Sequence, residues 1–198
     1  MRKLHLLLLP AVLLALGFGL VACGGSDESD EDAVIETIET SATSSDPADC
    51  TELATVAFLE QTEFEQGDAA IESCEESADE TENDPDSVEV SKVEVDGSNA
   101  TADVAFVGGS YDGQVLSVAL VEEDGTWKMD ELTGFVTFDQ EHLAQSFQEG
   151  VTSGSNALPA AVGECLGEEL GELPRGDFED LILSGEPQPL VELVEGCQ

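Results

Sequence analysis

The stretch between residues 87 and 138 constrains the fold most, because apolar and polar residues alternate along it and glycine-containing turns interrupt the alternation at regular intervals. The turns are Asp96-Gly97-Ser98, Gly108 to Gly113, and Asp124-Gly125. Alternation bounded by turns of this kind predicts four antiparallel strands joined as a meander. In the first strand the apolar positions change face after Ser91-Lys92, which predicts a β-bulge there.

Helical spacing flanks this sheet on both sides. Residues 49–66 place apolar side chains on one helical face, and Gly67 ends the run so that Asp68 can cap a second, shorter helix. From residue 139 onward, apolar residues again recur at helical spacing. The expected helix starts there are Asp139, Pro159, Asp177 and Pro189. We therefore expect an α+β protein with helices, then an antiparallel sheet, then a small all-helical segment over residues 139–198.

Residues 23–48 differ from both regions. They carry many charges, several Ser and Thr residues and no aromatic residue, so they offer little apolar surface to bury on folding. We expect this segment to be an acidic, flexible tether ahead of the folded part of the chain.

The order of these features resembles a known family. The chain has an apolar helix ending at Gly67-Asp68, a cysteine in the next helix at Cys74, and a hairpin Leu-Val-Glu-Glu-Asp-Gly-Thr-Trp-Lys-Met-Asp from Leu120 to Asp130. This pattern is similar to the small NTF2-like, or cystatin-like, lipoprotein domains of actinobacteria. The resemblance covers residues 49–138. It implies a cone in which N-terminal helices pack on a curved antiparallel sheet.

The first 23 residues resemble a bacterial lipoprotein signal. Arg2 and Lys3 precede an apolar run over residues 4–21, and the string Leu-Val-Ala-Cys then ends at Cys23. In lipoproteins that cysteine is acylated with diacylglycerol, palmitate being a typical chain, and a signal peptidase removes the residues before it, here 1–22. The alternative is an uncleaved signal anchor, because about 18 apolar residues can span a bilayer. Both alternatives attach the chain to the cell membrane with its later residues on the extracytoplasmic side.

Four further cysteines remain: Cys50, Cys74, Cys165 and Cys197. An even number in an oxidising compartment favours two disulfides. Zinc is the competing interpretation, but the chain has no Cys-x-x-Cys pair and only His142 outside the leader. Of three connectivities we favour Cys50 with Cys74 and Cys165 with Cys197, because each pair falls within one short segment. A continuous helix over residues 50–66 would be about 24 Å long, so the first pair requires crossed helices or a chain that folds back.

A disulfide-closed helical tail, from Cys165 through two short helices to Cys197, also resembles a segment that recurs in actinobacterial surface proteins. Closing a loop of about 30 residues contributes roughly 3 kcal/mol, which a helical unit this small needs.

The chain is strongly acidic. Without residues 1–22 it has 45 acidic residues and three basic ones, a net charge of −42. The basic residues are Lys92, Lys128 and Arg175. Such a surface repels phosphate backbones and anionic lipid headgroups, so nucleic acid is not expected as a partner and acyl chains have to hold the protein at the membrane. Self-repulsion of this size is typical of halophilic proteins, and we expect salt to stabilise the fold.

No metal or cofactor site is expected. The hexads ending at Gly97 and Gly125 place Lys92 and Leu120 where a calcium-binding EF-hand loop requires its first oxygen ligand. The two Asp-Gly pairs therefore indicate hairpin turns.

Few residues are suited to catalysis. No Ser-His-Asp or Cys-His constellation is present, and we expect His142 to be solvated at a helix start beside Glu141. The NTF2-like resemblance implies polar side chains inside the cone, for which Asp103, Tyr111 and Asp130 are the candidates. The alternation of their strands places both aspartates toward water.

The sequence therefore predicts a non-catalytic protein that binds a small molecule, an envelope component or a partner protein, or that has a structural role. Tyr111 and Trp127 are candidates for a pocket mouth, with a core or turn position as the alternative. A small NTF2-like enzyme remains the competing hypothesis. A transporter's solute-binding protein is disfavoured, because residues 23–198 are too few for two lobes that close on a substrate.

Overall fold

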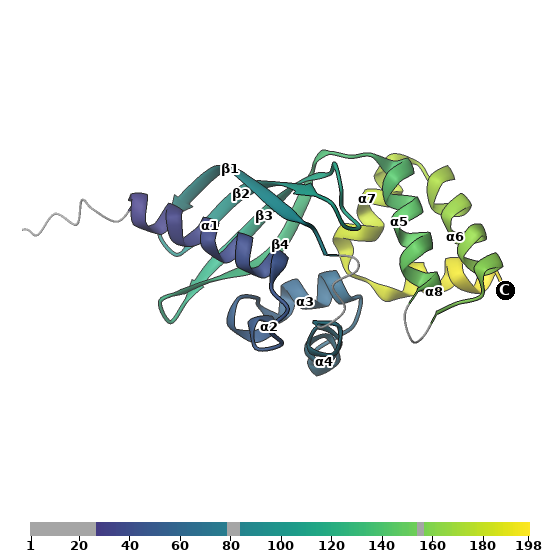
Figure 1. The fold of residues 1–198 in the computed structure, drawn as a ribbon, viewed down its shortest axis with the longest axis horizontal. Helices are drawn as coiled ribbons and strands as arrows, with labels where there is room; N and C mark the ends of the chain where they lie inside the picture. The colour runs from purple at the N-terminus through teal and green to yellow at the C-terminus, as the bar shows by residue number, and fades with distance from the viewer. Residues whose placement is uncertain (1–26, 79–83, 154–156) are drawn as a thin grey trace, which may run out of the picture.

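The computed structural model describes residues 27–78, 84–153 and 157–198. The leader and Cys23 lie outside these ranges, so the prediction of lipidation is not addressed by the fold. In chain order the elements are α1 (Asp27–Thr43), α2 (Asp49–Glu52), α3 (Val56–Glu63), α4 (Asp68–Ser77), β1 (Ser87–Asp96), β2 (Asn99–Val107), β3 (Val115–Glu123), β4 (Thr126–Thr137), α5 (Gln140–Thr152), α6 (Ala160–Glu172), α7 (Arg175–Ser184) and α8 (Pro187–Gly196). The protein is α+β, with an open antiparallel sheet (Figure 1).

The sheet is the predicted meander. Its strand order is β1-β2-β3-β4, and each strand pairs antiparallel with the next. The bulge in β1 is confirmed, because the register with β2 shifts between Ser91 and Glu94 and Lys92 has a φ of +52°. Asp124 and Gly125 both have positive φ, as the tight hairpin between β3 and β4 requires.

The prediction of a flexible tether over residues 23–48 is wrong for Asp27–Thr43, which form α1. Helix α1 lies across one face of the sheet and contacts both edge strands, β1 and β4 (Figure 1). Val34 and Ile38, one helical turn apart, are completely buried against the sheet, and Ala42 continues the stripe. The composition of residues 23–48 did not indicate this helix. A narrow apolar stripe is enough to order a helix when a sheet face covers that stripe.

The expected helix over residues 49–66 is two helices, α2 and α3. Between them the backbone leaves the helix and pairs with β4: Thr55 N–H donates to Met129 O at 2.8 Å, and Met129 N–H donates to Leu53 O at 2.8 Å. The break turns α2 back toward α4. Cys50 therefore meets Cys74 with 6.1 Å between their Cα atoms, which is the folding back that this pairing requires.

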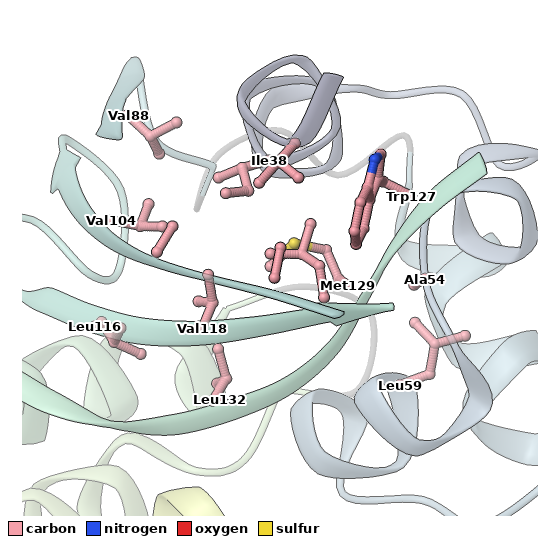
Figure 2. Packing of buried hydrophobic residues seen from close by; sticks show 14 of the residues in the cluster. Ile38, Ala54, Leu59, Val88, Val104, Leu116, Val118, Trp127, Met129 and Leu132 are labelled. Atoms are coloured by element: carbon pink, nitrogen blue, oxygen red, sulfur yellow. The ribbon is translucent and has the colours of Figure 1, made fainter. Parts of the chain in front are cut away.

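The first hydrophobic core lies between the sheet, α1 and α3 (Figure 2). Leu59 comes from α3, and Met129 and Trp127 come from β4. Trp127 is 5% exposed, so it is a core residue and not part of a pocket mouth.

Helices α5 to α8 form a second core at one end of the sheet (Figure 1). Phe178 of α7 is fully buried there, with its ring 5.6 Å from Phe138 and 6.3 Å from Phe147. Cys165 and Cys197 pair at a Cα distance of 5.7 Å and join α6 to the end of α8. Both cysteine pairs favoured by the sequence thus lie at disulfide distance.

The helix starts agree with expectation in part. Asp139 caps α5, because its side chain accepts a hydrogen bond from His142 N–H at 3.1 Å. Helix α7 begins earlier than predicted, directly after Pro174, so Asp177 lies inside its first turn and not at its cap. Helix α8 likewise begins at Pro187, ahead of the expected Pro189. A proline with its fixed φ starts a helix without a side-chain cap.

Candidate functional site

Asp103 points away from the first core, because its neighbours Ala102 and Val104 are buried in it. Its carboxylate lies 2.7 Å from Lys92 Nζ and accepts a hydrogen bond from Ser117 Oγ at 2.7 Å. The hydrogen bond with Lys92, followed by that with Ser117, lowers the pKa of Asp103. This aspartate forms an ion pair on the face of the sheet opposite the first core.

Asp130 lies elsewhere, at the contact between β4 and α3. Its carboxylate accepts a hydrogen bond from Thr55 Oγ1 at 3.0 Å, and Thr55 also caps α3 by accepting from Phe58 N–H. The structure therefore does not bring the three cone candidates together: Asp103 and Asp130 each belong to a local hydrogen-bond arrangement, and Tyr111 is apart from both.

His142 is not solvated as predicted. Its Nε2 atom is buried and has no hydrogen-bond partner within the described ranges. The first turn of α5 packs against the rest of the protein, and the neighbouring Leu143 and Ala144 are core residues.

A cavity suited to a small molecule lies where three elements meet: the end of α3, the hairpin between β2 and β3, and one side of α5. It has a volume of about 510 Å³. Aromatic, carboxylate and hydroxyl groups line it together. They include Glu63, Phe64, Ser110, Tyr111, Ser146 and Phe147.

Tyr111 forms the hairpin wall of this cavity. Its ring packs against Phe106 with 5.5 Å between the centroids. Burial raises the pKa of Tyr111 to about 12, and the negative charge of Glu63 adds to the shift. The phenol is therefore neutral at physiological pH. No described residue forms a hydrogen bond with its hydroxyl.

Glu63 is the last residue of α3. Phe64 then ends the helix in a left-handed conformation, with a φ of +54°. The Glu63 carboxylate accepts a hydrogen bond from Ser73 Oγ of α4 at 2.8 Å. Burial raises the pKa of Glu63, and the bond from Ser73 offsets part of the rise. Glu63 also borders a second cavity of about 220 Å³ beside the Cys50–Cys74 pair.

No basic side chain of residues 27–78, 84–153 or 157–198 neutralises Glu63. Lys92 pairs with Asp103, Lys128 lies 3.6 Å from Glu123, and Arg175 lies 2.7 Å from Glu179. These are the only Lys and Arg residues within the ranges that the structure describes. Sequence reasoning found Tyr111 but missed Glu63, because one acid among 45 carries no signal of its own.

No group of His, Cys, Asp or Glu side chains within residues 27–78, 84–153 and 157–198 is arranged to hold a metal ion. In the same ranges, no helix combines the length and the apolar character that a membrane crossing requires.

Comparison with protein families, with curated proteins and with solved structures found no match to this chain.

Proposed function

We propose that this chain is a lipid-anchored protein of the extracytoplasmic side of the cell membrane, with a non-catalytic binding role. The leader and Cys23 supply the anchor in this proposal. The two disulfide-distance pairs support it, because structural disulfides persist in oxidising compartments outside the cytoplasm. A small molecule or an envelope protein is the proposed partner, and nucleic acid is not.

The cavity between α3, the hairpin and α5 carries the binding role. It holds a partly buried carboxylate, a phenol that forms no hydrogen bond with a described residue, and aromatic walls in one place. Small-molecule sites are concave and mostly apolar, with a few polar groups that orient the ligand. This cavity has that composition, and its volume of about 510 Å³ lies within the usual range of such sites.

The NTF2-like fold is part of the proposal. The four-stranded antiparallel sheet, with α1 across one face and α3 beside β4, supports it. In an NTF2-like protein the ligand cavity lies inside the cone, whereas the proposed cavity lies at the end of the sheet where α5 begins. The binding role therefore depends on the cavity and not on the fold assignment.

A small enzyme is the alternative, and one observation favours it: Glu63 and Tyr111 line the same cavity and both have raised pKa values. A general acid or base works best when its pKa lies near the operating pH. At about 12, the pKa of Tyr111 is far from that range, so we prefer binding to catalysis.

The anchoring proposal is tested by Cys23→Ser in the native host. We expect the variant to leave the membrane fraction or to accumulate as uncut precursor, and intact mass to lose the acyl chains carried by the unmodified protein. Ser26→Ala is the matched control, because it changes a side chain close to Cys23 but leaves both the anchor and the two cysteine pairs in place. Unchanged fractionation and mass in Cys23→Ser would contradict the proposal.

A further inference from the structure

We propose that the cavity at the end of α3 binds a small organic cation of the quaternary ammonium class, with the Glu63 carboxylate as its counter-ion. This proposal rests on the binding role and names its ligand class. Three features of the cavity carry it: a carboxylate without a cationic partner among the described residues, aromatic walls, and a phenol whose hydroxyl forms no hydrogen bond with a described residue.

Glu63 brings a carboxylate to a cavity whose other described lining residues carry no charge. An ionised carboxylate that is removed from water requires a compensating partner. Glu63 accepts a hydrogen bond from Ser73, and every Lys and Arg of the described ranges is engaged with another acid. A cation entering the cavity would supply the positive charge that the described residues do not.

The groups that line the cavity suit an organic cation better than a metal ion. Ca²⁺ takes six to eight oxygen ligands, and Mg²⁺ requires six in near-ideal geometry. Among the described residues that line this cavity, Glu63 is the only one with a carboxylate, which argues against a divalent metal. Aromatic faces instead attract weakly hydrated organic cations through the ring quadrupole, and aromatic cages for quaternary ammonium groups use this interaction.

Three aromatic rings form walls of the cavity. Phe64 from the end of α3, Tyr111 from the hairpin and Phe147 from α5 line the cavity together with Glu63. The three rings come from three different elements, so they can surround a ligand on several sides. Because the phenol of Tyr111 stays neutral, its hydroxyl can bond a polar group on the ligand without adding charge.

The excess of acidic over basic residues also favours the binding of a cation. A net charge of −42 without the leader raises the local concentration of cations and speeds their arrival at the surface. This long-range attraction is not specific, so a test has to separate it from binding in the cavity.

The experiment is calorimetric titration of the full-length protein, purified in a non-ionic detergent, with choline as the probe. The neutral control ligand is 3,3-dimethylbutan-1-ol, which has the shape of choline with carbon in place of nitrogen. Titration in about 1 M sodium chloride suppresses the non-specific attraction. We expect choline to bind at least about tenfold more tightly than the alcohol, the factor that a cation–π contact near a carboxylate can provide.

Two variants with the same change of charge locate the site. We expect Glu63→Gln to weaken choline binding about tenfold, and Glu65→Gln, an exposed acid two residues away, to leave it unchanged. The glutamine can still accept the Ser73 hydrogen bond, and equal melting temperatures of the two variants establish that both fold. Phe147→Leu should also weaken choline more than the alcohol.

The proposal is overturned if choline and the alcohol bind alike, if neither binds, or if the two glutamine variants behave identically. None of these results affects anchoring through Cys23, which fractionation decides separately. Recovery of choline with unchanged mass after incubation supports the non-catalytic role, whereas a chemically altered product overturns that role.

Discussion

The side-chain amide of Gln61 pairs with both backbone groups of Leu132, as a neighbouring strand would. Its Nε2 donates to Leu132 O at 2.9 Å, and Leu132 N–H donates to its Oε1 at 2.6 Å. The same Nε2 also donates to Leu183 O in α7. One buried side chain of α3 therefore covers part of the free edge of β4 and ties α7 to it.

Replacing that amide should destabilise the fold strongly. Gln61→Leu keeps much of the side-chain volume but leaves a buried N–H and C=O of Leu132 without partners. We expect a loss of about 2–4 kcal/mol in the free energy of unfolding, measured in urea. Gln66→Leu alters an exposed glutamine nearby and should change the stability by less than about 0.5 kcal/mol. Equal effects of the two changes would contradict a special role for Gln61.

Helix α1 should contribute to stability although its segment has the composition of a disordered tether. Ile38→Ala removes three methyl or methylene groups from the sheet-facing side and should cost about 2–5 kcal/mol by urea unfolding. Glu36→Ala, on the exposed side of the same helix, should have little effect. If the helix were not packed on the sheet, both variants would match the parent protein.

The sheet was predictable from the sequence because its signals are local. Ala100, Ala102 and Val104 alternate with polar residues, and the Asp124-Gly125 turn fixes one register, so the meander does not depend on distant parts of the chain. The same holds for the start of α5, since the Asp139 cap contacts a backbone group only three residues away.

The features that could not be predicted from the sequence depend on contacts between residues far apart in the chain. Helix α1 forms because a sheet more than 40 residues later covers Val34, and the break between α2 and α3 forms because Thr55 pairs with Met129. The candidate site joins Glu63 to Tyr111 in the same way. No periodicity relates those two positions, so neither composition nor spacing could have placed them in one cavity.

The two cysteine pairs should both stabilise the protein. Replacing Cys165 and Cys197 together with serine opens a loop of 32 residues and should cost roughly 3–4 kcal/mol. The Cys50 and Cys74 double variant opens a loop of 24 residues, so its loss should be similar. Non-reducing peptide mapping of exported protein gives the pairing directly. Recovery of Cys50 linked to Cys165 would contradict the structure.

Stability should depend on pH through Asp103. Its pKa is lower in the folded state, so the ionised carboxylate stabilises the fold above the unfolded pKa of about 3.9, and this contribution is lost as the pH falls through the folded value. Asp103→Asn should therefore be less stable than the parent at pH 7. The difference should shrink steadily below about pH 4 in urea titrations. Asp180→Asn, an exposed control, should show no such trend.

Salt should raise the melting temperature. The described residues contain three ion pairs, one for each Lys or Arg, and the remaining acids repel one another. Sodium chloride at about 1 M shortens the Debye length to about 3 Å and screens most of that repulsion. Thermal unfolding in dilute buffer and in molar salt measures the effect. An unchanged midpoint would mean that the acids are too well solvated to oppose folding.

A second buried glutamine has a consequence for the proposed site. The amide of Gln114 donates to Asp139 O at 3.1 Å and accepts from Asp139 N–H at 2.8 Å. Gln114 follows the hairpin that carries Tyr111, and Asp139 precedes the helix that carries Phe147. The two hydrogen bonds between Gln114 and Asp139 therefore join two walls of the cavity directly. A ligand would then enter a preorganised site, and little of its binding energy would be spent on ordering the protein around it.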